Sequence, residues 1–312
     1  MILIGGENLI DYIQEPVSDG YPVYRAVPGG SPYNTAKAAS RQGVPVGYLT
    51  PFSDDSLGQL LQSEIAKEDL ALLGGTSTKP TTLAVVSLKN GQATYQFYRE
   101  NTAERDIDLA HLTKAIPADA QAFYVGSLAL SDGEDALIWA SLFKSMKARG
   151  LFCALDPNIR AAFIPDREGY LARLNDLIAV ADMVKLSDED LEWIAPGEDL
   201  KAATRGIFDR SAADLVVLTM GDKGAFAVTA AGEVEITPNP VENLIDTVGA
   251  GDTFMGSLLA QTSKRGLMAP GAITAASLGD MESLLQYAAR AAAINCTRKG
   301  CNPPTSEEVE AD

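Results

Sequence analysis

The stretch Asp246-Thr247-Val248-Gly249-Ala250-Gly251-Asp252-Thr253-Phe254 combines carboxylates with a small, glycine-rich turn, and an apolar helix pattern follows it. Gly249 and Gly251 let the backbone turn sharply and let a ligand come close to the main chain. The first N–H groups of the following helix have no partner within the helix, and its dipole is positive at that end. The stretch therefore predicts an anion-binding turn of the kind that holds phosphate.

Asp252 stands at the mouth of this turn. A carboxylate among phosphate-binding amides repels the ligand unless it has a chemical task, and accepting a proton from an attacking hydroxyl is such a task. Asp is also a common helix cap, which would be the simpler interpretation of an isolated Asp after Gly. The whole string favours Asp252 as a general base, with the backbone of Gly249, Ala250 and Gly251 as the anion hole.

Composition limits the kind of partner. The chain has 312 residues, of which 46% are hydrophobic, so it can bury a sizeable core as one large or two small domains. Its formal net charge is −17 and it has no basic run, which argues against nucleic acid and anionic membrane surfaces. No apolar run approaches the length of a membrane span. ATP is not excluded, because it needs only a local positive potential.

The cysteines and the single histidine narrow the chemistry further. Cys153, Cys296 and Cys301 are too few and too scattered for a disulfide framework or a zinc site, so a reducing cytoplasm is the expected location. His111 is the only histidine, and no Gly-x-Ser-x-Gly motif is present to pair with it. Proton transfer is therefore expected from carboxylates, Lys, Tyr or Cys.

Strands and helices alternate through most of the chain. From residue 120 onward we expect strands at 122–125, 151–155, 183–186 and 215–219, with helices between them and from 252. Residues 1–11 are expected to form one buried first strand, and the acidic tail from Ser306 is expected to be solvated. This alternation predicts an α/β fold with a doubly wound, mostly parallel sheet covered by helices on both faces.

Two β-rich runs at 81–88 and 93–99 interrupt the alternation. They are separated by Lys89-Asn90-Gly91-Gln92, and Asn-Gly between alternating strands favours a hairpin. With the β-rich run at 21–27, they predict a small sheet that stands off the main one. We therefore expect one domain over residues 1–312, with lid strands inserted at about 12–27 and 80–103.

Polar residues follow several of the expected strands. In open parallel sheets ligands bind beyond the carboxyl ends of the strands, where Asp11, Asp156-Pro157-Asn158-Ile159-Arg160 and Met220-Gly221-Asp222-Lys223-Gly224 are expected. Neither a P-loop nor a Gly-x-Gly-x-x-Gly after the first strand is present, which disfavours Walker-type NTPases and ordinary dinucleotide oxidoreductases.

A second motif, Pro28-Gly29-Gly30-Ser31-Pro32-Tyr33-Asn34-Thr35-Ala36, lies more than 200 positions before the first. Both motifs, in this order, resemble the two signatures of the ribokinase-like (PfkB) family of sugar kinases, and the resemblance covers essentially the whole chain. It implies a ribokinase-like fold and an ATP-dependent carbohydrate kinase. Such an enzyme transfers the γ-phosphoryl group to a primary hydroxyl, with ATP and Mg²⁺ as cofactors and K⁺ as a further candidate.

The resemblance also implies roles for individual residues. The sugar is expected at Asp11, Gly29, Gly30, Asn34, Tyr98, Arg99, Asn158 and Arg160. The nucleotide is expected at Thr219, Gly221, Gly224 and Asn295. The family's Asn-x-x-Glu element is matched only by Ser187-Asp188-Glu189-Asp190, where Asp190 would reach Mg²⁺ through water, and a helix cap at Ser187 is the alternative. Asp246 is the candidate for a monovalent cation.

The stretches around Phe97–Ala103, 156–160 and 185–189 look most like fructokinases. Arg99 and Arg160 would equally suit a carboxylate-bearing sugar such as 2-keto-3-deoxygluconate, which guanidinium groups bind bidentately. A sugar-binding relative without catalysis is the third possibility. The expected partners are a sugar and ATP, with no nucleic acid and no membrane, and the sequence leaves monomer and homodimer open.

Overall fold

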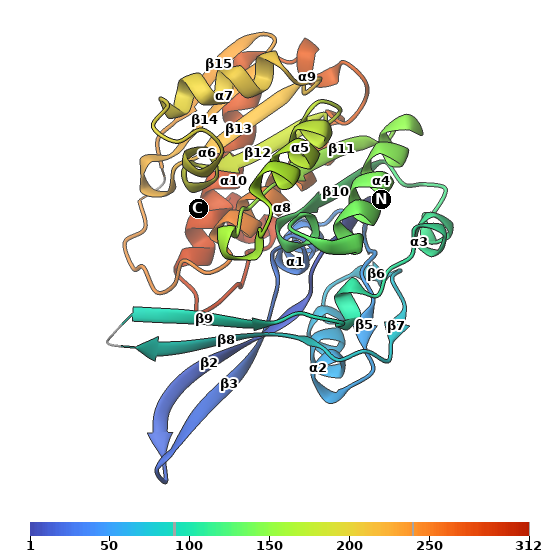
Figure 1. Cartoon of the computed structure of the whole chain (residues 1–312). Coiled ribbons are helices and arrows are strands. Elements are labelled where there is room, and N and C mark those ends of the chain that lie inside the picture. Colours follow the sequence, from blue (N-terminus) through green and yellow to red (C-terminus); the bar gives the residue numbers. More distant parts are fainter. Residues whose placement is uncertain (90–91, 239, 312) are drawn as a thin grey trace.

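The computed structural model describes residues 1–89, 92–238 and 240–311. In these ranges the main sheet has nine strands in the order β15-β14-β13-β12-β11-β10-β1-β4-β6 (Figure 1). Their bounds are β1 Ile2–Gly5, β4 Val46–Tyr48, β6 Leu70–Leu72, β10 Ala122–Gly126, β11 Phe152–Asp156, β12 Met183–Ser187, β13 Leu215–Thr219, β14 Ala225–Thr229 and β15 Gly232–Ile236. Neighbours are parallel from β6 to β13, and β14 and β15 are antiparallel to the strands beside them. The predicted mostly parallel sheet is confirmed.

Helices cover both faces of this sheet, which is why its strands are apolar on both sides. The helices are α1 Ser31–Arg41, α2 Ser56–Ile65, α3 Leu109–Ala115, α4 Gly133–Ala148, α5 Arg167–Ile178, α6 Asp188–Ile194, α7 Leu200–Asp209, α8 Ala250–Lys264, α9 Ala272–Ala275, α10 Leu278–Cys296 and α11 Ser306–Ala311. None of the helices in the described part of the chain has the length and apolar character that a membrane span requires.

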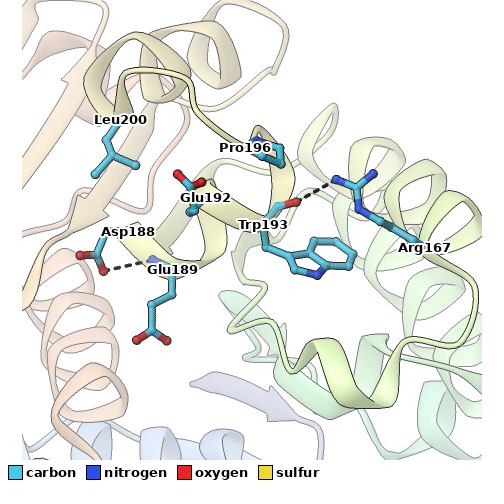
Figure 2. Close-up of a pocket in the computed structure, with 7 residues that line it drawn as sticks. All are labelled: Arg167, Asp188, Glu189, Glu192, Trp193, Pro196 and Leu200. Carbon is cyan, nitrogen blue, oxygen red and sulfur yellow. Dashed lines mark hydrogen bonds between the residues drawn. The ribbon is translucent and has the colours of Figure 1, made fainter.

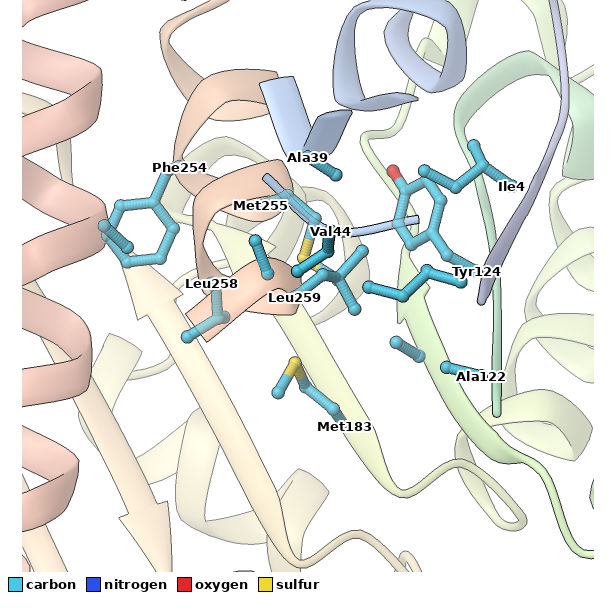
Figure 3. Close-up of a cluster of buried hydrophobic side chains, with 14 of the residues drawn as sticks. Ile4, Ala39, Val44, Ala122, Tyr124, Met183, Phe254, Met255, Leu258 and Leu259 are labelled. Carbon is cyan, nitrogen blue, oxygen red and sulfur yellow. The ribbon is translucent and has the colours of Figure 1, made fainter. Parts of the chain in front are cut away.

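Successive residues of β10 point into two different cores. Ala122 and Tyr124 pack with Leu258 of α8 and with residues of α1 and α10, and part of this core is drawn in Figure 3. Phe123 and Val125 pack on the other face with residues of α4, α5 and α7. Because strand side chains alternate between faces, one apolar strand anchors both layers of helices.

A separate four-stranded sheet has the order β3-β2-β8-β9, with β2 Leu9–Ser18, β3 Tyr21–Gly29, β8 Thr82–Lys89 and β9 Gln92–Tyr98. It projects away from the helix-covered main sheet (Figure 1), which confirms the predicted small sheet. Strands β8 and β9 are antiparallel, whereas the Asn90-Gly91 turn predicted between them lies outside the described residues. A short parallel pair, β5 Phe52–Ser53 and β7 Thr76–Ser77, completes the strands of the described part.

Two expectations about the ends of the chain are wrong. Residues 1–11 do not form one strand, because β1 ends at Gly5 and the chain turns at Gly6, whose φ is 128°. The chain then enters the small sheet at Leu9, so Asp11 belongs to that sheet. The acidic tail is not simply solvated, because Ser306–Ala311 form α11 and its Val309 is buried.

Candidate active site

The glycine-rich turn stands directly before α8, and Gly249 is the residue that caps this helix. Its φ is 75°, in the left-handed region, and a Cβ added there would lie 2.4 Å from Cys301 Sγ. Both the backbone conformation and the space therefore require glycine. Ala250 and Gly251 are the first two helical residues and Asp252 is the third. The N–H groups of this first helical turn are free of intrahelical partners and suit an anion.

Hydrogen bonds connect this turn to the end of α10 and to the loop that follows it. Asp246 accepts the N–H of Val248 on Oδ1 at 3.1 Å and the N–H of Gly300 on Oδ2 at 2.9 Å. Asn295 donates to the carbonyl of Val248 at 2.9 Å and accepts the N–H of Asn302 at 2.8 Å. The structure thus gives Asn295, which was expected at the nucleotide, a fully buried place where its amide joins two loops.

Asp252 is oriented by α1. Its Oδ1 accepts a hydrogen bond from Ser31 Oγ at 2.7 Å, and its Oδ2 accepts one from Asn34 Nδ2 at 2.8 Å. Burial raises the pKa of Asp252, and the two hydrogen bonds together with the charges of Lys185 and Arg160 offset part of this rise. The carboxylate is therefore a stronger base than an exposed Asp.

A second carboxylate faces Asp252. Burial and the negative charge of Asp252 raise the pKa of Asp11 to about 6. Gly29 lies across the β2–β3 ladder from Leu9, and a Cβ added to it would lie 2.4 Å from Asp11 Oδ2. Gly29 thus leaves the room that the Asp11 carboxylate occupies, and Asn34 in turn binds Asp252.

Lys185 was missed as a site residue. It stands in β12 and its Nζ lies 2.9 Å from Asp156 Oδ2, with both side chains buried. A Cβ added to Gly251 would lie 3.5 Å from the same Nζ, so the ammonium group is beside the anion-binding turn. Burial lowers the pKa of Lys185, but the charges of Asp156 and Asp190 outweigh burial and raise it overall, so Lys185 is charged.

The structure gives Arg99 a different place from the predicted one. The side chain is 6% exposed. Its Nε donates to Glu104, its Nη1 to Ser131 and Asp132, and its Nη2 to the carbonyl of Leu128 and to Asp135. A guanidinium has five N–H donors, and each of them has an acceptor here. Arg99 is therefore part of a buried ion-pair network and has no donor left for a sugar.

The other predicted sugar residues lie nearer the surface. Asn158 follows β11 with a φ of 40°, and its Oδ1 accepts a hydrogen bond from Arg160 at 2.7 Å. Arg160 is exposed, and its positive charge is the smallest of the influences that lower the pKa of Asp252 against the larger effect of burial. Tyr98 ends β9 in the small sheet and is 52% exposed.

The predicted nucleotide residues after β13 form a tight turn. The N–H of Met220 donates to the carbonyl of Gly224 at 2.9 Å, and the φ angles of Gly221 and Gly224 are 55° and 91°. A Cβ added to Gly224 would lie 2.0 Å from the carbonyl oxygen of Ile236. The turn itself explains both glycines, and the hydroxyl of Thr219 donates to the carbonyl of Leu186. Nucleotide binding at these residues stays a prediction.

Both carboxylate oxygens of Asp190 accept hydrogen bonds from neighbouring parts of the chain. Its Oδ2 accepts hydrogen bonds from the backbone N–H and the hydroxyl of Ser187, and its Oδ1 accepts the N–H of Ile159 at 2.6 Å. Ser187 and Asp190 thereby form a capping box at the start of α6. Within the described ranges, no group of three or more His, Cys, Asp or Glu side chains could hold a metal ion. The helix-cap alternative is what this geometry supports.

A groove of about 950 Å³ lies beside α6 (Figure 2). Arg167 donates to the carbonyl of Trp193 at 2.8 Å, and its guanidinium lies over the indole ring. The acidic residues Asp188, Glu189 and Glu192 line the same groove. These carboxylates make it a poor place for a phosphate, so the glycine turn before α8 is the better candidate.

The chain is similar to known carbohydrate kinases in sequence and in fold. The model of the pfkB family carbohydrate kinases matches residues 10–308. A fructokinase of Rhizobium leguminosarum bv. trifolii is 36% identical over 269 residues, which is 86% of this chain and 81% of the relative. A fructokinase of Xylella fastidiosa with bound ATP superposes with a TM-score of 0.89 at 26% identity, covering 99% of this chain and 97% of the other. A fructokinase of Vibrio cholerae O395, in a form bound to fructose, ADP and calcium ion, shares the fold, with a TM-score of 0.83 at 24% identity over 99% and 97% of the two chains.

The family match spans nearly the whole chain, and it includes the turn at Gly249, the carboxylate of Asp252 and the donors on α1. This chain therefore belongs to the pfkB family of carbohydrate kinases.

Proposed function

We propose that this chain phosphorylates fructose at a primary hydroxyl, with ATP as the phosphoryl donor. The observation that carries the proposal is the position of Asp252. It lies in the first turn of α8, behind a glycine cap, and each of its oxygens accepts a hydrogen bond from α1. The names of the relatives support fructose as the sugar, and the ATP in the Xylella fastidiosa structure supports the donor.

The turn at Gly249 suits the phosphates of ATP, which would supply the transferable phosphoryl group. The N–H groups of Gly249 and Gly251 offer hydrogen bonds to developing negative charge, whereas the N–H of Ala250 donates to the carbonyl of Thr247 at 3.2 Å until a ligand binds. The ammonium of Lys185 adds a fixed positive charge beside this turn. Magnesium is typically held by phosphate oxygens and water with few protein ligands, which agrees with the lack of an all-protein metal cluster within the described ranges. A monovalent cation beside Asp246 remains a prediction.

The chain's own residues manage the proton. Asp252 takes the proton of the attacking sugar hydroxyl as the new oxygen–phosphorus bond forms and the bond to the leaving ADP oxygen breaks. Asp11 binds other hydroxyls of the sugar, and Asn34 holds the base in place. The raised pKa of Asp252 helps this step, because a stronger base takes the proton more readily.

The small sheet is proposed to act as a lid. Strands β2, β3, β8 and β9 carry Asp11, Gly29 and Tyr98, so closure over the sugar would bring these residues to the substrate and exclude water that would otherwise accept the phosphoryl group. Amide exchange in residues 82–89 and 92–98 should slow at saturating fructose. Unchanged exchange would count against a lid.

The whole proposal is tested by ADP release. The parent and Asp252→Asn are mixed with ATP and Mg²⁺ and with each of a panel of sugars that includes fructose and 2-keto-3-deoxygluconate. Fructose should give the highest kcat/KM, and the variant should lose it. A strong preference for the sugar acid would favour the alternative kinase, and no ADP release with any sugar would favour a non-catalytic sugar-binding protein.

We propose a cytoplasmic location, because Cys153, Cys296 and Cys301 are free thiols. We also propose that residues 1–312 act as one kinase domain. A monomer and a homodimer are both compatible with this proposal.

A further inference from the structure

Glu7 is a buried carboxylate that the proposed reaction does not use directly. It lies between β1 and β2 and is 2% exposed. Its Oε1 accepts the backbone N–H of Ser31 at 3.2 Å, whereas its Oε2 is buried without a hydrogen-bond partner among the described residues. A buried carboxylate oxygen without a partner costs free energy, so a neutral side chain of the same shape would serve stability better.

The hydrogen bond from Ser31 places Glu7 at the N-terminus of α1. Gly30 caps this helix but has no side chain that could accept a hydrogen bond from it, and Pro32 lies in the first turn. The carboxylate of Glu7 therefore acts as the cap from outside the helix, where the helix dipole favours a negative charge. A Cβ added to Gly30 would lie 2.6 Å from the carbonyl oxygen of Glu7, so the close approach of the two segments depends on this glycine.

The same first turn of α1 orients the base. Ser31 Oγ and Asn34 Nδ2 each donate to one oxygen of Asp252. Glu7, the start of α1 and Asp252 thus form one chain of contacts: Glu7 accepts the backbone N–H of Ser31, and Ser31 donates its hydroxyl to the base.

We propose that Glu7 is a positioning residue for the proposed kinase reaction: its charged carboxylate fixes the N-terminus of α1, and α1 holds Asp252 in the orientation that accepts the proton. The inference rests on the proposed function, since it assigns the task of Asp252. The inference predicts that the ionised carboxylate of Glu7 lowers the stability of the fold and raises the rate of phosphoryl transfer.

Several charged and titratable groups surround Glu7. Burial raises its pKa to about 7, the hydroxyl of Ser127 and the charge of Arg99 lower the pKa, and the charge of Glu104 raises it. Burial raises the pKa of the phenols of Tyr48 and Tyr124, and the charge of Glu7 adds a smaller rise to each. Because the pKa of Glu7 in the fold lies above its ordinary value of 4.5, the proton on Glu7 stabilises the fold; this contribution is fully present below pH 4.5 and is lost as the pH rises through 7.

The experiment compares the parent with Glu7→Gln, which keeps the shape and an acceptor for Ser31 but removes the charge. Three quantities are measured: Tm at pH 5.5 and 8.5, kcat/KM for fructose over the same range, and amide exchange at the start of α1. At pH 8.5 the Tm should rise, kcat/KM should fall about tenfold, and exchange at residues 31–35 should quicken. At pH 5.5 the differences in Tm and kcat/KM should be much smaller, because Glu7 is then mostly protonated in the parent.

Asp199→Asn is the matched control. Asp199 caps α7 through the N–H of Ala202, so this variant removes a carboxylate cap from a helix that carries none of the site residues. It should lower the Tm slightly and leave kcat/KM and exchange in α1 unchanged.

The outcomes separate this inference from the proposed function. A folded Glu7→Gln variant with the parent's kcat/KM at pH 8.5 would overturn the positioning role. A lower Tm at pH 8.5 would also overturn it, since Glu7 would then be an ordinary stabilising residue. If the parent releases no ADP with any sugar, the proposed function fails, and unchanged exchange in α1 would reject the cap as well.

Discussion

Ser31 Oγ donates to Asp252 Oδ1 at 2.7 Å, although the two residues lie 221 positions apart in the sequence. The bond joins the first residue of α1 to the first turn of α8. The two helices pack closely, since a Cβ on Gly256 would lie 2.6 Å from the Cβ of Ala38. The two glycine-containing motifs of the sequence therefore meet in the structure, where one supplies the carboxylate that we propose as the base and the other orients it.

The first prediction concerns this hydrogen bond. The bond from Ser31 lowers the pKa of Asp252, so Ser31→Ala should raise that pKa further. An Asp works as a base only when ionised, so the acid limb of the kcat/KM profile should move to higher pH. A shift of one unit would lower the rate about tenfold on that limb and leave the alkaline plateau much less affected.

Ser40→Ala is the control for this experiment. Ser40 also lies on α1, but its hydroxyl donates to the carbonyl of Asp69, away from the base. Its profile should keep the parent's midpoint. If the midpoint of Ser31→Ala stayed with the parent as well, the hydrogen bond would have no part in tuning Asp252.

The second prediction concerns the base itself. Asp252→Asn has nearly the same shape and cannot accept the proton, so turnover should fall at least about a hundredfold. The fold should be kept, because burial disfavours the charged form of Asp252 and a neutral side chain avoids this cost. The measurements are kcat with saturating ATP and fructose and Tm at pH 8. Turnover above about a tenth of the parent rate would contradict the role of Asp252.

The third prediction separates stability from catalysis at Lys185. Lys185→Met leaves the buried carboxylate of Asp156 without its partner and should destabilise the fold by about 3–5 kcal/mol. The double variant Lys185→Met with Asp156→Asn removes both charges and should recover most of that loss in a urea titration. It should still have a low kcat, because the charge beside Gly251 is missing. Full recovery of kcat in the double variant would mean that Lys185 is only structural.

Local sequence pattern was enough to predict much of the fold. Apolar runs with few polar breaks predicted the buried strands, and the Gly-Ala-Gly turn predicted the start of α8 near Asp252. Those signals lie within a few neighbouring residues. The break at Gly6 was missed although a local signal was present, because Gly5-Gly6-Glu7-Asn8 interrupts the apolar run and a Gly-Gly pair favours a turn.

The roles of Glu7, Ser31 and Lys185 could not be predicted in this way. Each depends on a partner that only the tertiary structure brings near, such as Asp156 for Lys185, which lies 29 positions earlier and one strand away. Lys185 stands near the carboxyl end of a core strand, and its place there was the only local signal. A buried cation at that edge needs a carboxylate, and the neighbouring strand ends with one.

The last prediction concerns Arg99 and Arg160, which made a sugar acid an alternative to fructose as the substrate. Arg99→Ala should destabilise the fold by about 3–5 kcal/mol, because it leaves the buried carboxylate of Glu104 without its ion-pair partner, whereas Asp135 keeps Arg105. The ratio of kcat/KM for fructose to that for 2-keto-3-deoxygluconate should stay at the parent value. Arg160→Ala should change stability by less than about 0.5 kcal/mol, since the side chain is exposed. Urea titration and steady-state kinetics on both sugars check these values. The parent could instead prefer the sugar acid and lose this preference in Arg160→Ala. That result would show that a guanidinium binds the carboxylate of the substrate. The proposed substrate would then be a sugar acid in place of fructose, and the proposed kinase chemistry of Asp252 would stand.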